Sequence, residues 1–256
     1  MRVSVLGLGE AGSLIASDLA RVGDDVHGYD PAEVATPEGV IVDQDPATAV
    51  VGSKMVLALT PGSAARPALT GVIDSMENGA LYADLSTGAP SSKVELAEMV
   101  GGRGMMFADV ALMAPVPGRG LATPALVSGT GAERYATEIN GRGGDVTVVG
   151  PDAGEAATRK LLRSVLMKGL AAVLIESTEA AVRADKADWF WDHVVDALTS
   201  LDEPMIRRLV LDTTPHARRR VDEMKAARQL LVDLGVPPTM TEATIASLSE
   251  VMTSDG

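Results

Sequence analysis

The N-terminal glycine pattern constrains the fold more than any other feature of this chain. An apolar segment, Arg2–Leu6, runs directly into a G-x-G-x-x-G motif, and an Ala- and Leu-rich stretch of helical character follows. In a strand–turn–helix unit, the first glycine permits the tight turn, the second lets the backbone approach a pyrophosphate, and the third lets the helix pack close to the strand. The motif therefore predicts a dinucleotide-binding βαβ unit, with the pyrophosphate on the N–H groups that start the helix. The cofactor-binding residues of this loop are Gly7, Leu8, Gly9, Glu10, Ala11 and Gly12.

An acidic residue at the end of a second predicted strand, Asp25–Tyr29, indicates which dinucleotide binds. A carboxylate at Asp30 accepts hydrogen bonds from the adenosine ribose hydroxyls and repels a 2′-phosphate. Residues 31–35 contain no Arg or Lys that would bind such a phosphate. We therefore expect NAD rather than NADP as the cofactor; the alternative is that Asp30 only caps a turn before Pro31.

Composition and charge exclude several classes of function. The 256-residue chain has 46% hydrophobic and 22% charged residues, as is typical of a globular protein, and its net charge of −13 argues against a nucleic-acid partner. The start of the chain has no signal-peptide pattern, and no apolar run is long enough to span a membrane, so we expect a cytoplasmic protein. Cysteine is absent, and the three histidines are scattered, so no metal site is expected. These histidines are His27, His193 and His216.

Strand and helix patterns alternate through the first half of the chain. Such alternation predicts an α/β fold with an N-terminal Rossmann domain, whose doubly wound sheet is mostly parallel. Two polar loops, Thr60-Pro61 and Ser86-Thr87, follow buried strands, and ligands of this fold bind beyond the carboxyl ends of the strands. We therefore add Thr60, Pro61, Ser86 and Thr87 to the cofactor-binding residues. The predicted strands are 55–59, 81–84, 104–110, 125–128 and 146–149, and the predicted helices are 63–75 and 91–100.

The pattern changes after Gly150 to one that is helical throughout. Asp152 followed by Glu155 has the spacing of a capping box, and the residues up to about 184 contain no proline. We interpret 152–184 as a long helix that links two domains: 1–150, which binds NAD, and 151–256, a helical domain for substrate binding and dimerisation. Breaks are predicted at 203–204, 214–215 and 235–238.

The linking helix also carries the strongest candidates for chemistry. Lys160, Ser164 and Lys168 follow one another at four-residue spacing, which places them along one stripe of a helix. A partly desolvated lysine beside a nicotinamide would have a lowered pKa and could accept a proton from a substrate hydroxyl. The alternative is that these lysines are solvated surface charges.

Four motifs together resemble the 3-hydroxyacid dehydrogenase family, which includes 3-hydroxyisobutyrate and 6-phosphogluconate dehydrogenases. They are the glycine loop, the D-x-S-T-x-x-P segment Asp84–Pro90, the strand end Phe107–Val110 and the lysine-bearing helix. The chain is similar to a subgroup of short members with a compact C-terminal domain. The resemblance implies a Rossmann domain, a long linking helix, and a helical domain through which two copies dimerise.

The resemblance also implies roles for individual residues. Ser86 and Thr87 correspond to the loop that lies near the substrate carboxylate and the nicotinamide in this family. Lys160 corresponds to the catalytic lysine, although Ser164 stands where the family has an asparagine four residues later. Lys168 remains a rival, and we favour Lys160.

The substrate loop departs from the family pattern. The family's D-x-P-V-S-G segment corresponds here to residues 109–120, which are longer, more apolar and without the serine. The change predicts a bulkier or more apolar substrate, with Met113 among its contacts. Arg119 could bind a substrate carboxylate, or it could face the solvent.

These observations predict an NAD-dependent oxidoreductase that acts on the CH–OH group of a small hydroxy acid. One alternative is an imine-reductase-like enzyme, and another is a protein that binds NAD(H) without catalysis. The expected partners are a small carboxylate substrate and a second copy of the chain. The second copy is expected because the linking helix carries more apolar side chains than one small domain should cover.

Overall fold

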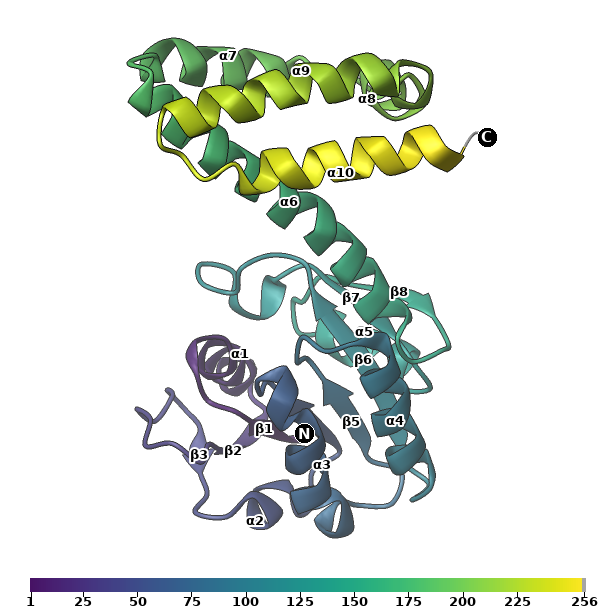
Figure 1. Cartoon of the computed structure of the whole chain (residues 1–256). Helices are drawn as coiled ribbons and strands as arrows, with labels where there is room; N and C mark the ends of the chain where they lie inside the picture. Colours follow the sequence, from purple (N-terminus) through teal and green to yellow (C-terminus); the bar gives the residue numbers. More distant parts are fainter. Residues whose placement is uncertain (255–256) are drawn as a thin grey trace. The chain divides into compact units, whose positions relative to one another are not determined.

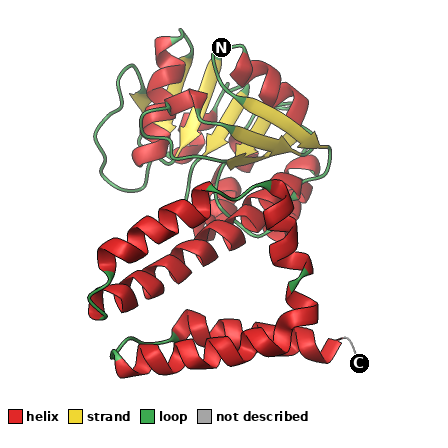
Figure 2. Cartoon of the chain, turned by 90° about the horizontal axis from the view of Figure 1, so that it is seen from above, coloured by secondary structure: helices red, strands yellow, loops and turns green. Residues whose placement is uncertain are grey.

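The computed structural model describes residues 1–254, with side chains through residue 251. The chain divides into two compact units, Met1–Arg163 and the residues from Ser164 onward. The first unit contains a sheet with helices around it, and the second is built of helices (Figure 1, Figure 2). Helix α6 (Glu155–Arg183) contributes residues to both units.

The first unit contains one sheet, whose strand order is β3-β2-β1-β4-β5-β6-β7-β8 in the described chain. Every neighbouring pair is parallel except β6 and β7, which are antiparallel. The expected mostly parallel, doubly wound sheet is confirmed. The strands are β1 (Arg2–Leu6), β2 (Asp25–Tyr29), β3 (Ile41–Val42), β4 (Met55–Ala58), β5 (Leu81–Asp84), β6 (Met106–Leu112), β7 (Ala125–Ser128) and β8 (Val146–Gly150). The α-helices before α6 are α1 (Glu10–Arg21), α2 (Pro46–Val50), α3 (Ala65–Val72), α4 (Pro90–Gly101) and α5 (Ala132–Asn140).

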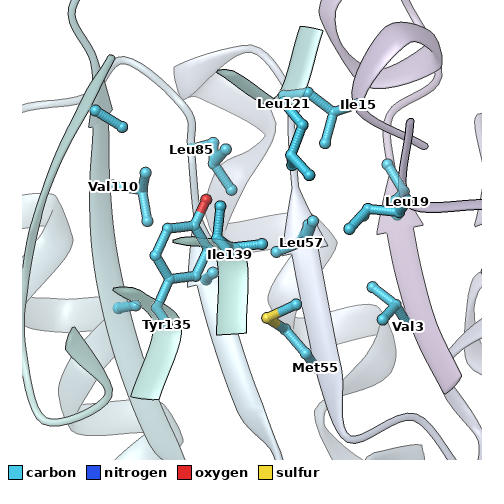
Figure 3. Packing of buried hydrophobic residues seen from close by; sticks show 14 of the residues in the cluster. Val3, Ile15, Leu19, Met55, Leu57, Leu85, Val110, Leu121, Tyr135 and Ile139 are labelled. Atoms are coloured by element: carbon cyan, nitrogen blue, oxygen red, sulfur yellow. The ribbon is translucent and has the colours of Figure 1, made fainter. Parts of the chain in front are cut away.

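Helices bury both faces of the sheet, so its inner strands are apolar on both sides. On one face, Val3 and Val5 of β1 pack in one cluster with residues of α1 and α5 (Figure 3). On the other face, Leu6 belongs to a second cluster, with residues of α2, α3 and α4. Successive side chains of a strand point to opposite faces, and this alternation divides β1 between the two clusters.

Several elements differ from the prediction in length or position. Strand β6 begins at Met106, two residues later than predicted, and the predicted helix 63–75 consists of α3 between two short 3₁₀ turns. The capping box predicted at Asp152 is wrong. Helix α6 begins at Glu155, whose N–H donates to the backbone carbonyl of Asp152 at 3.4 Å, and side chains of β6 and β7 bind the N–H groups of Gly154, Ala156 and Ala157.

The second unit has a very small core of its own. Beyond α6 it contains α7 (Ala187–Thr199), α8 (Glu203–Leu211), α9 (Thr213–Asp233) and α10 (Thr239–Ser254). Helices α9 and α10 lie side by side (Figure 1), and their hydrophobic cluster consists of the buried residues Ala180, Leu231 and Val236 with Leu234 against them. None of the helices described is long and apolar enough to cross a membrane.

A carboxylate of α6 caps α10. Glu176 accepts hydrogen bonds from the N–H groups of Met240 and Thr241, at 2.6 and 2.9 Å, and from the Thr241 hydroxyl at 2.7 Å. Burial raises the pKa of Glu176, but these hydrogen bonds outweigh that effect and hold the pKa below its usual value. The carboxylate form therefore stabilises the fold.

We expect Glu176→Gln to lower the free energy of unfolding by about 1 kcal/mol, because a neutral amide oxygen is a weaker acceptor than a carboxylate. The charged contribution is fully present above the ordinary glutamate pKa and is lost as pH falls through the lowered pKa of the folded protein. The difference between wild type and variant should therefore shrink in urea denaturation as the buffer is acidified. Glu179→Gln, which removes an exposed partner of Arg183 on the same helix, is the control. An equal loss in both variants would contradict a special role for Glu176.

Candidate functional site

The loop between β1 and α1 is shaped by close approaches of backbone to backbone. Gly7 has φ +94°, and its N–H donates to the Tyr29 carbonyl at 2.8 Å. A Cβ atom on Gly7 would lie 2.6 Å from the Leu59 carbonyl oxygen, and one on Gly12 would lie 1.8 Å from the Gly7 oxygen. A Cβ atom on Gly9 would meet nothing described within 4 Å. The first and third glycines therefore close the turn, and the second leaves open space where a pyrophosphate could approach.

The start of α1 offers hydrogen-bond donors to that space. Gly9 occupies the N-cap position and has no side chain with which to cap the helix. The Leu8 side chain is buried in the core, so Leu8 can meet a ligand only through its backbone, whereas Glu10 is exposed. Such an N-terminus favours an anion through its N–H groups and its dipole.

Asp30 is held at the edge of the same loop. Its carboxylate accepts hydrogen bonds from the N–H of Leu8 at 2.7 Å and from the N–H of Ala32 at 2.9 Å. These two bonds fix a negative charge beside the glycine turn, at the end of β2.

An apolar pocket of about 230 Å³ adjoins this loop, between the ends of β1, β2 and β4 and helix α3. The Thr60 hydroxyl in this pocket is buried, and it finds no hydrogen-bond partner among the described residues. An unsatisfied buried hydroxyl is costly, so a polar ligand atom bound there would be stabilising. The pocket, the open side of Gly9 and the carboxylate of Asp30 together fit a dinucleotide. The lining residues are Leu6, Gly7, Tyr29, Pro31, Pro46, Thr60, Ala64, Pro67, Ala68 and Gly71. Pro61 is exposed next to them.

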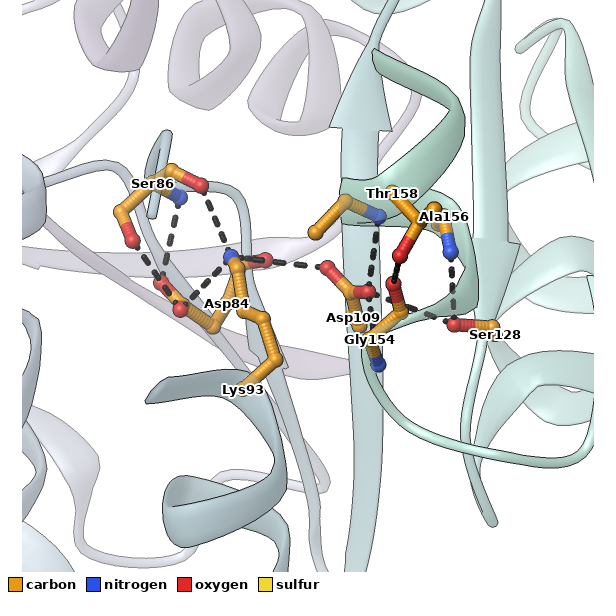
Figure 4. Close-up of polar contacts among 9 residues, drawn as sticks. Asp84, Ser86, Lys93, Asp109, Ser128, Gly154, Ala156 and Thr158 are labelled. Atoms are coloured by element: carbon orange, nitrogen blue, oxygen red, sulfur yellow. Dashed lines mark hydrogen bonds and ion pairs between the residues drawn. The ribbon is translucent and has the colours of Figure 1, made fainter. Parts of the chain in front are cut away.

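The loop after β5 is organised by the buried carboxylate of Asp84. The Ser86 N–H donates to Asp84 Oδ1 at 3.1 Å, and the Ser86 hydroxyl donates to Asp84 Oδ2 at 3.0 Å (Figure 4). Lys93, in the first turn of α4, donates to Asp84 Oδ2 at 2.8 Å and to the Ser86 carbonyl at 2.7 Å. The Ser86 hydroxyl is thus engaged within its own loop, whereas Thr87 is exposed.

A second buried carboxylate, Asp109 of β6, connects this loop to the start of α6. Asp109 is the register partner of Asp84 on the neighbouring strand, and its Oδ1 lies 3.5 Å from Lys93 Nζ. Its Oδ2 accepts hydrogen bonds from the N–H groups of Gly154 and Ala157, at 3.1 and 3.0 Å. Ser128 of β7 accepts from a third N–H, that of Ala156. These contacts replace the local capping box and fix the first turn of α6 against the sheet (Figure 4).

Lys160 lies one turn further along α6, beside a narrow crevice that is too tight in this structure to hold a water molecule. Residues of the Ser86 loop, the end of β6 and α6 line this crevice, and Lys160 itself is half-buried. Ser164 and Lys168 belong to the second unit, where Lys168 is exposed and donates to the Ser164 hydroxyl at 3.4 Å. Of the two candidate lysines, Lys160 is the one that lines this crevice together with Ser86 and Thr87. The lining residues are Ser86, Thr87, Gly88, Asp109, Val110, Ala111, Ala157, Lys160 and Leu161.

The loop that follows β6 is attached to α1. Asp18 accepts a hydrogen bond from the Leu121 N–H at 2.8 Å, and a Cβ atom on Gly120 would collide with the Asp18 carboxylate. Met113 is half-buried and Arg119 is exposed on this loop. Their predicted contacts with a substrate remain predictions.

Sequence reasoning missed Lys93, Asp84 and Asp109 as parts of the site. One signal was present: two predicted buried strands, β5 and β6, each carry an aspartate near the carboxyl end. Two neighbouring buried carboxylates require a cation nearby. Lys93 follows Asp84 by nine residues in the sequence and supplies this cation.

Comparison with known proteins identifies the kind of domain that the first half of the chain forms. Residues 2–137 match the NAD binding domain of 6-phosphogluconate dehydrogenase, and residues 181–251 match a domain of unknown function (DUF1932). A probable 3-hydroxyisobutyrate dehydrogenase of Mycobacterium tuberculosis is 26% identical over 205 residues, which cover 77% of this chain and 68% of that protein. A solved conserved protein, described as structurally similar to 3-hydroxyacid dehydrogenases, is 25% identical with a TM-score of 0.61, over 100% of this chain and 98% of its own.

Two further solved structures share the fold at lower identity. An imine reductase from Pseudomonas sp. is 19% identical with a TM-score of 0.79, over 99% of this chain and 94% of its own. A reductive aminase from Aspergillus terreus, solved with NADPH and ethyl levulinate, has the same identity, coverage and TM-score. The family match spans the glycine loop and the sheet from β1 to β7, and so the chain belongs to the 3-hydroxyacid dehydrogenase family, with an N-terminal nicotinamide-dinucleotide-binding domain of the 6-phosphogluconate dehydrogenase type.

Proposed function

We propose that this protein is an NAD-dependent oxidoreductase that transfers hydride between the cofactor and a small hydroxy acid, with Lys160 as the proton acceptor and donor. The observation that carries the proposal is the crevice at the carboxyl ends of β5 and β6, which Lys160 shares with Ser86 and Thr87. The 26% identical probable 3-hydroxyisobutyrate dehydrogenase supports the substrate class.

The residues divide the task between them. The glycine loop, Asp30 and the pocket around Thr60 would hold the dinucleotide, which supplies or accepts the hydride when bound. In oxidation, neutral Lys160 would accept the proton of the substrate hydroxyl; in reduction, its ammonium would return a proton to the carbonyl oxygen. The exposed Thr87 hydroxyl could orient the substrate carboxylate by donating a hydrogen bond to it. Lys168 would remain outside this chemistry.

The preference for NAD is proposed from the charge at Asp30. A 2′-phosphate at the ribose would have to bind beside a carboxylate that two backbone N–H groups hold in place. Two negative charges close together repel each other, and residues 31–35 contain no Lys or Arg that could offset this repulsion.

We expect NADH to bind at least about tenfold more tightly than NADPH, which corresponds to about 1.4 kcal/mol. Asp30→Ala should narrow this ratio, because it removes the negative charge beside the ribose. Isothermal titration calorimetry of wild type and variant measures both affinities. Glu33→Ala removes an exposed carboxylate three residues further on and is the matched control. Equal affinities in the wild-type protein would refute the preference.

We expect Lys160→Ala to lower kcat by about 10²–10⁴-fold, the usual contribution of a general acid or base. The affinity for NADH should change little, because the dinucleotide contacts lie on other loops. Lys168→Ala is the matched control and should cost much less, and Ser164→Ala should fall between wild type and Lys160→Ala. Steady-state kinetics with a substrate found by screening provides the measurement. A severe loss in Lys168→Ala together with a nearly silent Lys160→Ala would reverse the assignment.

A second candidate is reduction of an imine, because the fold extends over 99% of the chain to an imine reductase and Ser164 replaces the family's asparagine. A panel of hydroxy acids and cyclic imines, followed by NADH absorbance, separates the two candidates. Turnover of imines alone, undisturbed by Lys160→Ala, would favour the second.

We also propose that the protein assembles as a homodimer through its helical unit. The described apolar side chains of this unit are mostly exposed: Val165 is 75% exposed and Ile175 69%, and α7 and α8 bury no residue. A second copy of the same surface would cover them.

We expect the protein to be a dimer at micromolar concentration in light scattering. Leu166→Glu should shift it toward monomer, because it would bury an unpaired charge in the interface. Val51→Glu, at an exposed apolar residue of the first unit, should leave the dimer intact. A monomeric wild-type protein would refute the assembly.

A further inference from the structure

The ammonium group of Lys93 is buried where a charge is expensive to hold. Its side chain is 1% exposed, and Asp84 and Asp109 beside it are equally enclosed. Burial of a lysine is tolerated only when anionic or carbonyl oxygens replace the water around it. Three oxygens accept its hydrogen bonds, namely Asp84 Oδ2 and the carbonyl oxygens of Ser86 and Asp84. Asp109 Oδ1 lies 3.5 Å from Nζ as an ion-pair partner and has no hydrogen bond among the described residues.

These contacts reach two separate parts of the proposed active site. Through Asp84 and the Ser86 carbonyl, Lys93 holds the loop that carries Thr87. Through Asp109, it connects to the first turn of α6, one turn before Lys160. The two parts are 70 residues apart in the chain at Asp84 and Gly154, and the cluster joins them across β5 and β6 (Figure 4).

We infer that Lys93 is a positioning residue, which fixes the Ser86–Thr87 loop and the start of α6 relative to each other and sets the electrostatic field at Lys160. The inference rests on the proposed role of Lys160 as the proton acceptor and donor. Lys93 lies behind the crevice and does not line it, so it acts through the two carboxylates.

The charges of the cluster predict the direction in which removal of one of them changes the protonation of Lys160. One ammonium and two carboxylates leave the cluster with one net negative charge, and Asp109 lines the same crevice as Lys160. On α6, the cation of Arg163 lies three residues after Lys160, one turn along the helix, whereas Glu155 and Arg159 pair with each other at 3.4 Å. Removal of the Lys93 charge adds a net negative charge near Lys160 and favours its ammonium form. Removal of the Asp84 charge has the opposite effect.

The test measures the protonation of Lys160 without any substrate. The full-length protein with NADH is labelled with acetic anhydride over a range of pH, and the modification of each lysine is read by peptide mass spectrometry. Only the neutral amine reacts, so the pH dependence of labelling reports the pKa of Lys160. Lys54, an exposed lysine outside the site, serves as the reference in the same digest.

We expect Lys93→Met to lower the reactivity of Lys160 about tenfold at a pH below its pKa, and Asp84→Asn to raise it. Lys93→Arg keeps the charge and should restore the reactivity close to that of wild type. Lys54 labelling and the NADH dissociation constant should change less than about twofold in all three variants, since the dinucleotide contacts lie elsewhere. Lys54→Met is the matched control for loss of a lysine.

Two results would overturn the inference. If Lys93→Met folds and melts at a lower temperature but labels like the wild type, Lys93 only stabilises the fold. If Lys93→Met does not fold, Asp84→Asn decides, and unchanged Lys160 reactivity in that variant refutes the role. A failure of every hydroxy acid and imine in the turnover screen would refute the proposed function without altering the labelling result, so the two failures can be told apart.

Discussion

Two aspartates face each other inside this protein, and the rest of the site depends on how their charges are balanced. Asp84 and Asp109 are register partners on neighbouring parallel strands, and both are fully buried. Burial of two carboxylates is costly unless a cation lies beside them, and Lys93 Nζ lies 2.8 Å from Asp84 Oδ2 and 3.5 Å from Asp109 Oδ1. The loop after β5 and the start of α6 both take their hydrogen bonds from these two carboxylates.

The two halves of the site are therefore built by different physical means. The dinucleotide loop depends on missing side chains, because a methyl group at Gly7 or Gly12 would collide with backbone oxygens. The crevice beside Lys160 depends on buried charges held by precise hydrogen bonds. A side chain added at Gly7 or Gly12 should disturb dinucleotide binding and leave the crevice in place. Loss of a buried charge should disturb the crevice and leave the dinucleotide loop in place.

Much of the first unit could be predicted from the sequence, because strongly apolar strands and the glycine motif are local signals. Strands β5 and β7 have the predicted bounds. The strand β3, the helix α2 and the nine-residue helix α5 were not predicted. Elements as short as β3 and α2 show no periodicity. The Lys93 cluster could not be recognised either: its residues lie on separate elements, and only the paired register of β5 and β6 brings the carboxylates together. For the same reason, the sequence placed the cap of α6 at Asp152 and not at Asp109.

The first turn of α6 depends for its stability on the sheet, because its capping groups lie on β6 and β7. The N–H groups at the start of a helix have no partner within the helix, and here those of Gly154, Ala156 and Ala157 bind side chains of β6 and β7. The nearest of these acceptors along the chain, Ser128, precedes Ala156 by 28 residues. The N-terminal end of the long helix should therefore be fully stabilised only when the antiparallel pair β6–β7 is in place. A fragment cut at residue 151 would lose its cap along with the sheet, and its first turn would fray.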